Sequence, residues 1–128
     1  MASLFLLRGV LLGQADGTLA AAATYSSGGS YPISVAIGDL NGDGRTDLAV
    51  ANYTNVGVLL RQADGTFAAA AMYSSGGNDP YSVAIGDLNG DGRADLAVAN
   101  LGSDNVGVLL GQAGGTLAAA ATYSSGGS

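Results

Sequence analysis

The sequence predicts an all-β fold made of repeated four-stranded antiparallel sheets, and three observations support this class. The segments 35–52 and 83–100 are identical except at one position, where Thr46 corresponds to Ala94. They begin 48 residues apart, a period typical of propeller blades or of helical arrays. The apolar stretches of each unit are short and alternating, and the chain contains 22 glycines. Both features disfavour helices, so we expect blades of the propeller type.

Each repeat unit contains four predicted strands, which we name A to D in chain order. In the first complete unit they lie near residues 34–40, 47–52, 56–62 and 66–73. Asp64-Gly65 lies between strands C and D, and this dipeptide predicts the positive φ angles of a type I′ hairpin turn. Gly114-Gly115 occupies the same place in the last copy and meets the same requirement. The Ser-Ser-Gly-Gly segment 74–77 then leads toward the next strand A.

Strand D of each copy contains four consecutive alanines, at 20–23, 68–71 and 118–121. An alanine run by itself favours a helix. Roughly six to eight residues between a glycine turn and a Ser-Gly loop are too few for a stable helix. We therefore predict strands whose small side chains let a neighbouring sheet approach closely.

The predicted strands form a leading half-blade, with strands C and D only, and two complete blades. The predicted boundaries are 1–30 for the half-blade and 31–78 and 79–128 for the two blades. A propeller ring typically needs about four to eight blades, so about two and a half blades do not close by themselves. Either the chain belongs to a longer array or copies of it associate. The unpaired edge of the leading strand C favours head-to-tail self-association, as a ring or as a filament.

The composition argues against enzyme chemistry. The chain has no Cys, His, Lys, Glu or Trp, which leaves Asp and Tyr as general acids and bases. We expect it not to be an enzyme. The net charge is −6, which disfavours nucleic acid and anionic membranes as partners. No segment reaches the ~18 consecutive apolar residues of a membrane helix, so we expect no membrane insertion.

Two short acidic loops hold six of the ten Asp residues and predict metal binding. The predicted ligands of the first loop are Asp39, Asn41, Asp43, the backbone carbonyl of Arg45, and Asp47, and those of the second are Asp87, Asn89, Asp91, the backbone carbonyl of Arg93, and Asp95. Oxygens at positions one, three, five, seven and nine of a tight loop converge on one point, and Ca²⁺ takes six to eight oxygen ligands. The alternative is an Asx-rich turn without metal, but two copies with a ninth-position Asp favour two calcium ions per chain.

These loops start like an EF-hand, but the twelfth position is Val50 or Val98 instead of Glu, and no flanking helix is predicted. The segments Gly-Asp-Leu-Asn-Gly-Asp-Gly-Arg-Thr-Asp-Leu-Ala-Val-Ala-Asn at 38–52 and its copy at 86–100 resemble the FG-GAP or VCBS-type repeat, the blade of integrin α-subunit propellers. The resemblance covers most of the chain after residue 8. It implies that the loop joins strands A and B, that it binds calcium, and that the protein is extracellular or on the cell surface.

Two functions follow from this interpretation. The first is a calcium-stabilised structural, adhesive or self-assembling module with a protein or glycan surface partner. The alternative is a propeller-type lectin, for which Tyr25, Tyr73 and Tyr123 are the recurring stacking candidates, although we expect these rings to pack between sheets. The sequon Asn52-Tyr53-Thr54 is a further candidate, for N-glycosylation.

Overall fold

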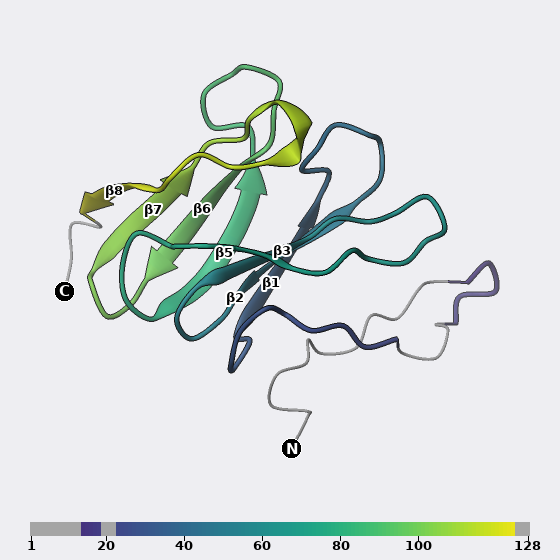
Figure 1. The fold of residues 1–128 in the computed structure, drawn as a ribbon, viewed down its shortest axis with the longest axis horizontal. Helices are drawn as coiled ribbons and strands as arrows, with labels where there is room; N and C mark the ends of the chain where they lie inside the picture. Colours follow the sequence, from purple (N-terminus) through teal and green to yellow (C-terminus); the bar gives the residue numbers. More distant parts are fainter. Residues whose placement is uncertain (1–13, 19–22, 125–128) are drawn as a thin grey trace.

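The computed structural model describes residues 14–18 and 23–124 and contains two four-stranded antiparallel sheets (Figure 1). The strands of the first sheet are β1 (Ser34–Gly38), β2 (Asp47–Ala51), β3 (Val56–Leu59) and β4 (Ala71–Tyr73). Those of the second are β5 (Pro80–Gly86), β6 (Asp95–Asn100), β7 (Asn105–Leu109) and β8 (Ala121–Ser124). Each sheet pairs its strands in chain order. The all-β prediction is therefore confirmed, and neither sheet closes on itself.

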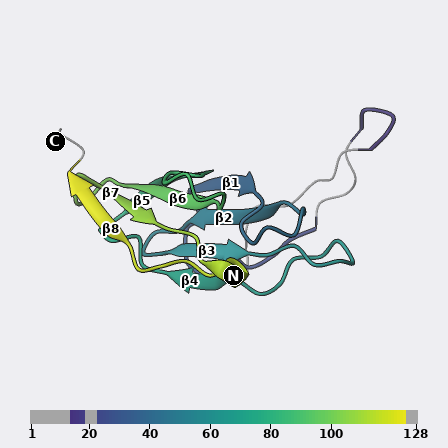
Figure 2. The same ribbon diagram turned by 90° about the horizontal axis from the view of Figure 1, so that it is seen from above.

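The two sheets pack face to face, with β1 and β2 of the first against β5 of the second (Figure 2). One face of the first sheet presents Ala49, Ala51 and Val58 to the main core, where they join Leu96 and Val98 of the second sheet. Alanines on the first sheet leave room for the larger residues opposite. Burial of each Leu or Val side chain contributes about 1.5–3 kcal/mol relative to exposure.

The central strand β2 is buried along its whole length, because both faces of the first sheet are covered around it. Leu48 and Val50 point away from the second sheet and pack with Tyr25 and Phe67 in a smaller core. The segment that contains Tyr25 thus covers the first sheet in the same way that the first sheet covers the second. A strand buried on both faces is a continuous apolar run, as in Leu-Ala-Val-Ala here.

The last strand of each blade is shorter than predicted. β4 covers only 71–73 of the predicted 66–73, and of the alanine run at 68–71 only Ala71 lies in it. Strand C likewise ends at Leu59, and beyond it only an isolated bridge joins Arg61 to Phe67. Alanine is depleted in strands because its methyl group covers little of a neighbouring strand, which accounts for the loss of regular pairing here.

The hairpin loop between strands C and D is not the predicted type I′ turn. In both complete copies only the last loop residue, Gly65 or Gly115, has a positive φ, of 88° or 87°. The amide of Gly65 donates to the Gln62 carbonyl at 2.9 Å, and that of Gln62 donates to the Thr66 carbonyl at 2.7 Å. These bonds define a three-residue loop closed by a left-handed glycine. Asp64 instead uses its carboxylate, which accepts from the Thr66 amide at 3.0 Å.

The connector between successive blades is held by a buried asparagine. Asn52 follows β2 and donates from Nδ2 to the Ser27 carbonyl at 3.0 Å and to Asn55 Oδ1 at 2.9 Å. Asn100 does the same for the Ser75 carbonyl and for Asn105. Because Asn52 is fully buried and its Nδ2 is engaged, the folded chain does not offer this sequon for glycosylation. Within the described residues, no helix has the length and hydropathy to cross a bilayer.

Candidate metal centres

The two acidic loops connect β1 to β2 and β5 to β6, as the sequence predicts for strands A and B. Each loop contains two left-handed glycines, Gly42 and Gly44 in the first and Gly90 and Gly92 in the second, with φ between 77° and 84°. Residues with a Cβ rarely adopt these angles, so the glycines allow the tight course of the loop.

Three carboxylates converge in each loop. Oxygens of Asp39, Asp43 and Asp47 lie within 4.8 Å of one another, and so do those of Asp87, Asp91 and Asp95. Three like charges at this spacing repel one another, and a divalent cation between them removes the repulsion. Carboxylate oxygens are the ligands that hard cations such as Ca²⁺ prefer, so each cluster has a donor set able to hold a metal ion.

The ninth-position aspartates, Asp47 and Asp95, also fasten the fold. Asp47 is fully buried, and its two oxygens accept hydrogen bonds from the amides of Leu40 at 2.8 Å and Arg61 at 2.7 Å. Asp95 accepts from Leu88 and Gly111, both at 2.7 Å. One carboxylate therefore joins the A–B loop to the end of strand C. The sequence analysis predicted these residues as metal ligands but not this second role, because the Arg61 and Gly111 amides that they bind are 14 and 16 residues away.

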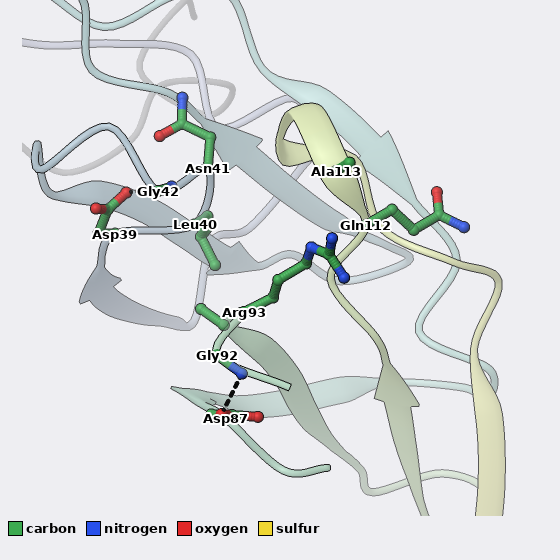
Figure 3. A pocket seen from close by; sticks show the side chains of 10 residues that line it. Asp39, Leu40, Asn41, Gly42, Asp87, Gly92, Arg93, Gln112 and Ala113 are labelled. Atoms are coloured by element: carbon green, nitrogen blue, oxygen red, sulfur yellow. Dashed lines mark hydrogen bonds between the residues drawn. The ribbon is translucent and has the colours of Figure 1, made fainter. Parts of the chain in front are cut away.

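The first-position aspartates organise the loop backbone. Asp39 accepts from the amides of Gly42 and Gly44, both at 2.8 Å, and Asp87 accepts from Gly90 and Gly92 at the same distance. The hydrogen bond from the Gly92 amide is the main cause that lowers the pKa of Asp87 below its ordinary value (Figure 3). The loop amides thus keep this carboxylate ionised and pre-shape the loop around it.

The third- and fifth-position residues are bonded within the loop. The Arg45 amide donates to Asp43 at 2.8 Å, and this bond is the main cause that lowers the pKa of the Asp43 carboxyl. Asn41 Oδ1 accepts from the Asp43 amide at 3.3 Å. The guanidinium of Arg45 forms an exposed ion pair with Asp43 at 3.2 Å, and Arg93 pairs with Asp91 at 3.6 Å. The roles of Asn41, Asn89 and of the Arg45 and Arg93 carbonyls as metal ligands stay predictions.

A cleft of about 480 Å³ separates the two loops (Figure 3). Asp39 and Asn41 line it from the first loop, Asp87 and Arg93 from the second, and Gln112 from the segment after β7. Sequence reasoning did not find this cleft, because the residues that line it come from two repeat units. It brings one guanidinium and two carboxylates to the edge of both candidate metal centres.

The recurring tyrosines have different surroundings. Tyr25 packs edge-to-face on Phe67, with ring centroids 5.2 Å apart, and Tyr73 packs on the main core. The prediction that these rings pack is confirmed for both, for Tyr73 between the two sheets and for Tyr25 against one face of the first sheet. It is wrong for Tyr123, which is 62% exposed, because no further sheet follows β8 in the described residues. Tyr31 and Tyr53 form an exposed edge-to-face pair, with centroids 6.2 Å apart.

The meandering four-stranded sheets, their 48-residue period and the acidic loop after the first strand of each define an open, propeller-type repeat protein. Comparison with family models agrees. The model described as FG-GAP-like repeat matches residues 8–50 and 39–98, and the model described as FG-GAP repeat matches residues 80–127. The chain belongs to the FG-GAP repeat family. Neither the comparison with curated proteins nor that with solved structures finds a significant match.

Proposed function

We propose that this chain is a calcium-stabilised FG-GAP repeat module that acts outside the cell in a structural, adhesive or self-assembling role. The observation that carries the proposal is the convergence of three aspartate carboxylates in each A–B loop, within 4.8 Å. Bound calcium would be held by Asp39, Asp43 and Asp47 in one loop and by Asp87, Asp91 and Asp95 in the other. Its chemistry there is electrostatic, since it neutralises the carboxylates and cross-links the loop.

The donor set favours calcium over magnesium. Mg²⁺ gives up its water reluctantly and is usually held by one or two carboxylates, whereas Ca²⁺ accepts a cage made entirely of protein oxygens. The affinity we expect is that of extracellular modules, with Kd about 10⁻⁴–10⁻³ M, because the loops lack a bidentate Glu at the twelfth position. Two bound ions would also offset four of the six net negative charges of the chain.

Calcium titration by calorimetry is the direct test of this proposal. We expect two calcium ions per wild-type chain, one in the Asp43→Ala variant and one in the Asp91→Ala variant. The matched control is Asp64→Ala, because Asp64 lies in a hairpin loop outside both clusters and its loss should leave two ions. Absence of binding heat in the wild type, together with a melting temperature that calcium does not change, would refute calcium binding.

Other parts of the proposal rest on composition and family. The chain has no Cys, His, Lys or Glu, and the polar side chains that line the cleft between the two loops are those of Asp39, Asn41, Asp87, Arg93 and Gln112, so we expect a role other than catalysis. FG-GAP repeats typically occur in extracellular or surface proteins, which supports the same location here. The partner would be a second copy or a protein or glycan at a surface, and not nucleic acid or a membrane interior.

A lectin function is the second candidate, and the exposed pair Tyr31–Tyr53 is the observation that favours it, since exposed aromatic faces can stack on sugar rings. A glycan array in the presence of calcium tests it. Binding that disappears in Tyr53→Ala and persists in Tyr123→Ala would support a lectin, whereas no binding to any glycan would remove this candidate.

A further inference from the structure

The strands β1 and β5 have nearly the same sequence but very different exposure. Val35 on β1 is 50% exposed, whereas its counterpart Val83 on β5 is 6% exposed. Ile37 is 68% exposed, whereas Ile85 packs against the main core. The difference arises because the first sheet covers β5, whereas no described segment covers the corresponding face of β1. Within the described residues, Val35 and Ile37 therefore form an exposed second copy of a surface that is buried once, on β5.

The opposite half of this interface is also present twice. At the end of β1, a Cβ on Gly38 would lie 3.0 Å from Ile85 Cγ2, so the two strands are in close contact there. At the end of β5, a Cβ on Gly86 would meet no atom within 4 Å. In the part of the chain that the structure describes, a receiving face on β1 and an inserting face on β5 are thus both uncovered. The β5 face of one copy is therefore complementary to the β1 face of another, just as the two sheets within one chain are complementary to each other.

The outer part of the receiving side is covered by the segment 23–30. Tyr25 packs on Phe67, the Ser27 carbonyl accepts from Asn52, and the Ser30 carbonyl accepts from the Tyr53 amide at 2.9 Å. These contacts cover β2 and β3 and stop short of Val35 and Ile37. Among the described residues, the segment therefore takes the place of the outer half of a blade, and no pair of strands A and B accompanies it.

The sequence of this covering segment has a near-perfect copy at the other end of the chain. Residues 9–30 and 107–128 are identical except that Asp16 corresponds to Gly114. The middle copy, 57–77, differs from 9–29 at three positions, Arg61, Phe67 and Met72. The C-terminal segment of one chain therefore has the side chains needed for the contacts that residues 23–30 make in another, and it is attached to strands A and B.

We propose that copies of this chain assemble head to tail by exchange. The second sheet of one copy, β5 to β8, displaces the leading segment of the next copy and places β5 over β1. The exchange preserves the contacts of the displaced segment, since nearly the same sequence replaces it, and additionally buries Val35 and Ile37. This inference rests on the self-assembling role proposed above and specifies its partner and its interface. Repetition of one such contact yields a ring if the rotation closes and a filament otherwise.

Disulfide trapping tests the interface, because the natural chain has no cysteine. A chain carrying Gly86→Cys is mixed with one carrying Ile37→Cys and oxidised. Both positions are open to solvent, so neither change should disturb the fold. We expect a covalent heterodimer on non-reducing gels. The control is one chain with Gly38→Cys and Ile85→Cys, where a Cβ on Gly38 would lie 3.4 Å from the Ile85 Cβ, close to the spacing in disulfides. This chain should close an internal disulfide and run as a monomer.

Two further variants test displacement. Tyr25→Ala weakens the hold of the leading segment and should raise the yield of heterodimer when introduced into the Ile37→Cys chain. Tyr123→Ala in the Gly86→Cys chain weakens the incoming sheet and should lower that yield. An aromatic pair of this kind corresponds to about a 2- to 10-fold change in equilibrium. If Tyr25→Ala and Tyr123→Ala both leave the yield unchanged, the exchange is wrong.

If the mixture gives no heterodimer while the control closes its internal disulfide, the head-to-tail interface is wrong. Calcium titration of the same single-cysteine chains separates this outcome from failure of the proposed function. Two bound ions without cross-linking would overturn the exchange alone. Cross-linking without bound calcium would leave the exchange supported and overturn only the calcium role.

Discussion

Leu40 and Leu88 occupy the second position of two acidic loops that differ at a single residue, yet 4% of one side chain is exposed and 54% of the other. The backbone amides of the two loops make the same hydrogen bonds. Asp39 and Asp87 each accept hydrogen bonds from two glycine amides at 2.8 Å, and Asp47 and Asp95 each accept from one amide of the same loop and one beyond strand C. Leu40 joins the main core because the second sheet lies against the first loop, whereas the second loop has no such neighbour in the described residues.

The comparison separates two kinds of structure in one repeat. The conformation of the loop comes from its own Asp and Gly residues and is the same wherever the loop occurs. Burial comes from the adjoining blade, so it depends on the position of the unit in the array, as in other repeat proteins whose units contact only their neighbours. Four predictions test this separation.

The largest effect is expected at Asp47, a site where the two blades should agree. Asp47→Ala leaves the buried Leu40 amide and the part-buried Arg61 amide without an acceptor, and it should lower the free energy of unfolding by about 2–6 kcal/mol, at about 1–3 kcal/mol for each amide. Asp95→Ala should have a comparable effect. Chemical denaturation in the presence of a chelator measures it without a contribution from metal. Asp47→Asn, which keeps one acceptor oxygen, should lose less. If the free energy of unfolding of Asp47→Ala in chelator equals that of the wild type, the two hydrogen bonds contribute nothing to stability.

A site where the blades should differ comes next. Leu40→Ala removes a buried side chain and should cost about 2–5 kcal/mol, whereas the same change at the exposed Leu88 should stay within about 0.5 kcal/mol. Urea denaturation of the two variants at low protein concentration measures the difference. Equal costs would show that Leu88 is covered in solution, and a cost for Leu88→Ala that grows with protein concentration would indicate a second copy as its cover.

Removal of calcium should again affect both blades equally. At a free calcium concentration of about 10 to 100 times Kd, each occupied site stabilises the folded state by about 1.4–2.7 kcal/mol. We therefore expect the melting temperature to rise with calcium in the wild type and to rise by roughly half as much in Asp91→Ala. Magnesium at the same concentration is the control and should shift it less. A full-sized calcium shift in Asp91→Ala would mean that only the first loop binds.

The smallest effect concerns the hairpin loops, which differ in sequence because Asp64 corresponds to Gly114. The hydroxyl and the amide of Thr66 donate to the Asp64 carboxylate and lower its pKa below the ordinary 3.8. The lowered pKa means that Asp64 stabilises the fold above its ordinary pKa and loses this contribution as pH falls through the folded value. Asp64→Gly should therefore be less stable than the wild type at pH 6, and this difference in stability should become smaller toward pH 3. Thermal melts of both proteins across this pH range measure the difference. A difference in melting temperature that grows as the pH falls would contradict the hydrogen bonds from Thr66 to Asp64.

The features predicted correctly from the sequence are those that repeat or that depend on neighbouring residues. The 48-residue period predicted the two sheets, and the acidic loops converge as the spacing of Asp39, Asp43 and Asp47 indicates. The predicted type I′ turn was wrong because an Asp-Gly dipeptide also fits a three-residue loop. In that loop the Asp64 carboxylate accepts from the Thr66 amide, and of the dipeptide only Gly65 is left-handed. The predicted length of strand D was wrong because a run of alanines does not reveal where strand pairing stops.

Other features depend on contacts between units, which no single unit contains. The role of Asp47 in binding the Arg61 amide and the exposure of Leu88 and Tyr123 are of this kind. The cleft between the two loops is another, since Asp39 and Gln112 lie in different blades. The sequence pattern of one repeat predicts which residues lie at a contact between units, but not which of these residues are left exposed.

Gly57 and Gly107 lie where the connector from the preceding blade crosses strand C. A Cβ at either position would collide with a connector carbonyl, that of Ser27 or that of Ser75, to which Asn52 or Asn100 also donates. Both partners of each contact lie within about one repeat length of the chain. A gene duplication that copies one 48-residue segment in tandem would therefore copy the carbonyl, the asparagine and the glycine together. The array can grow by such an event without a compensating mutation, because each new unit already has the asparagine and the glycine that accommodate the connector from the unit before it.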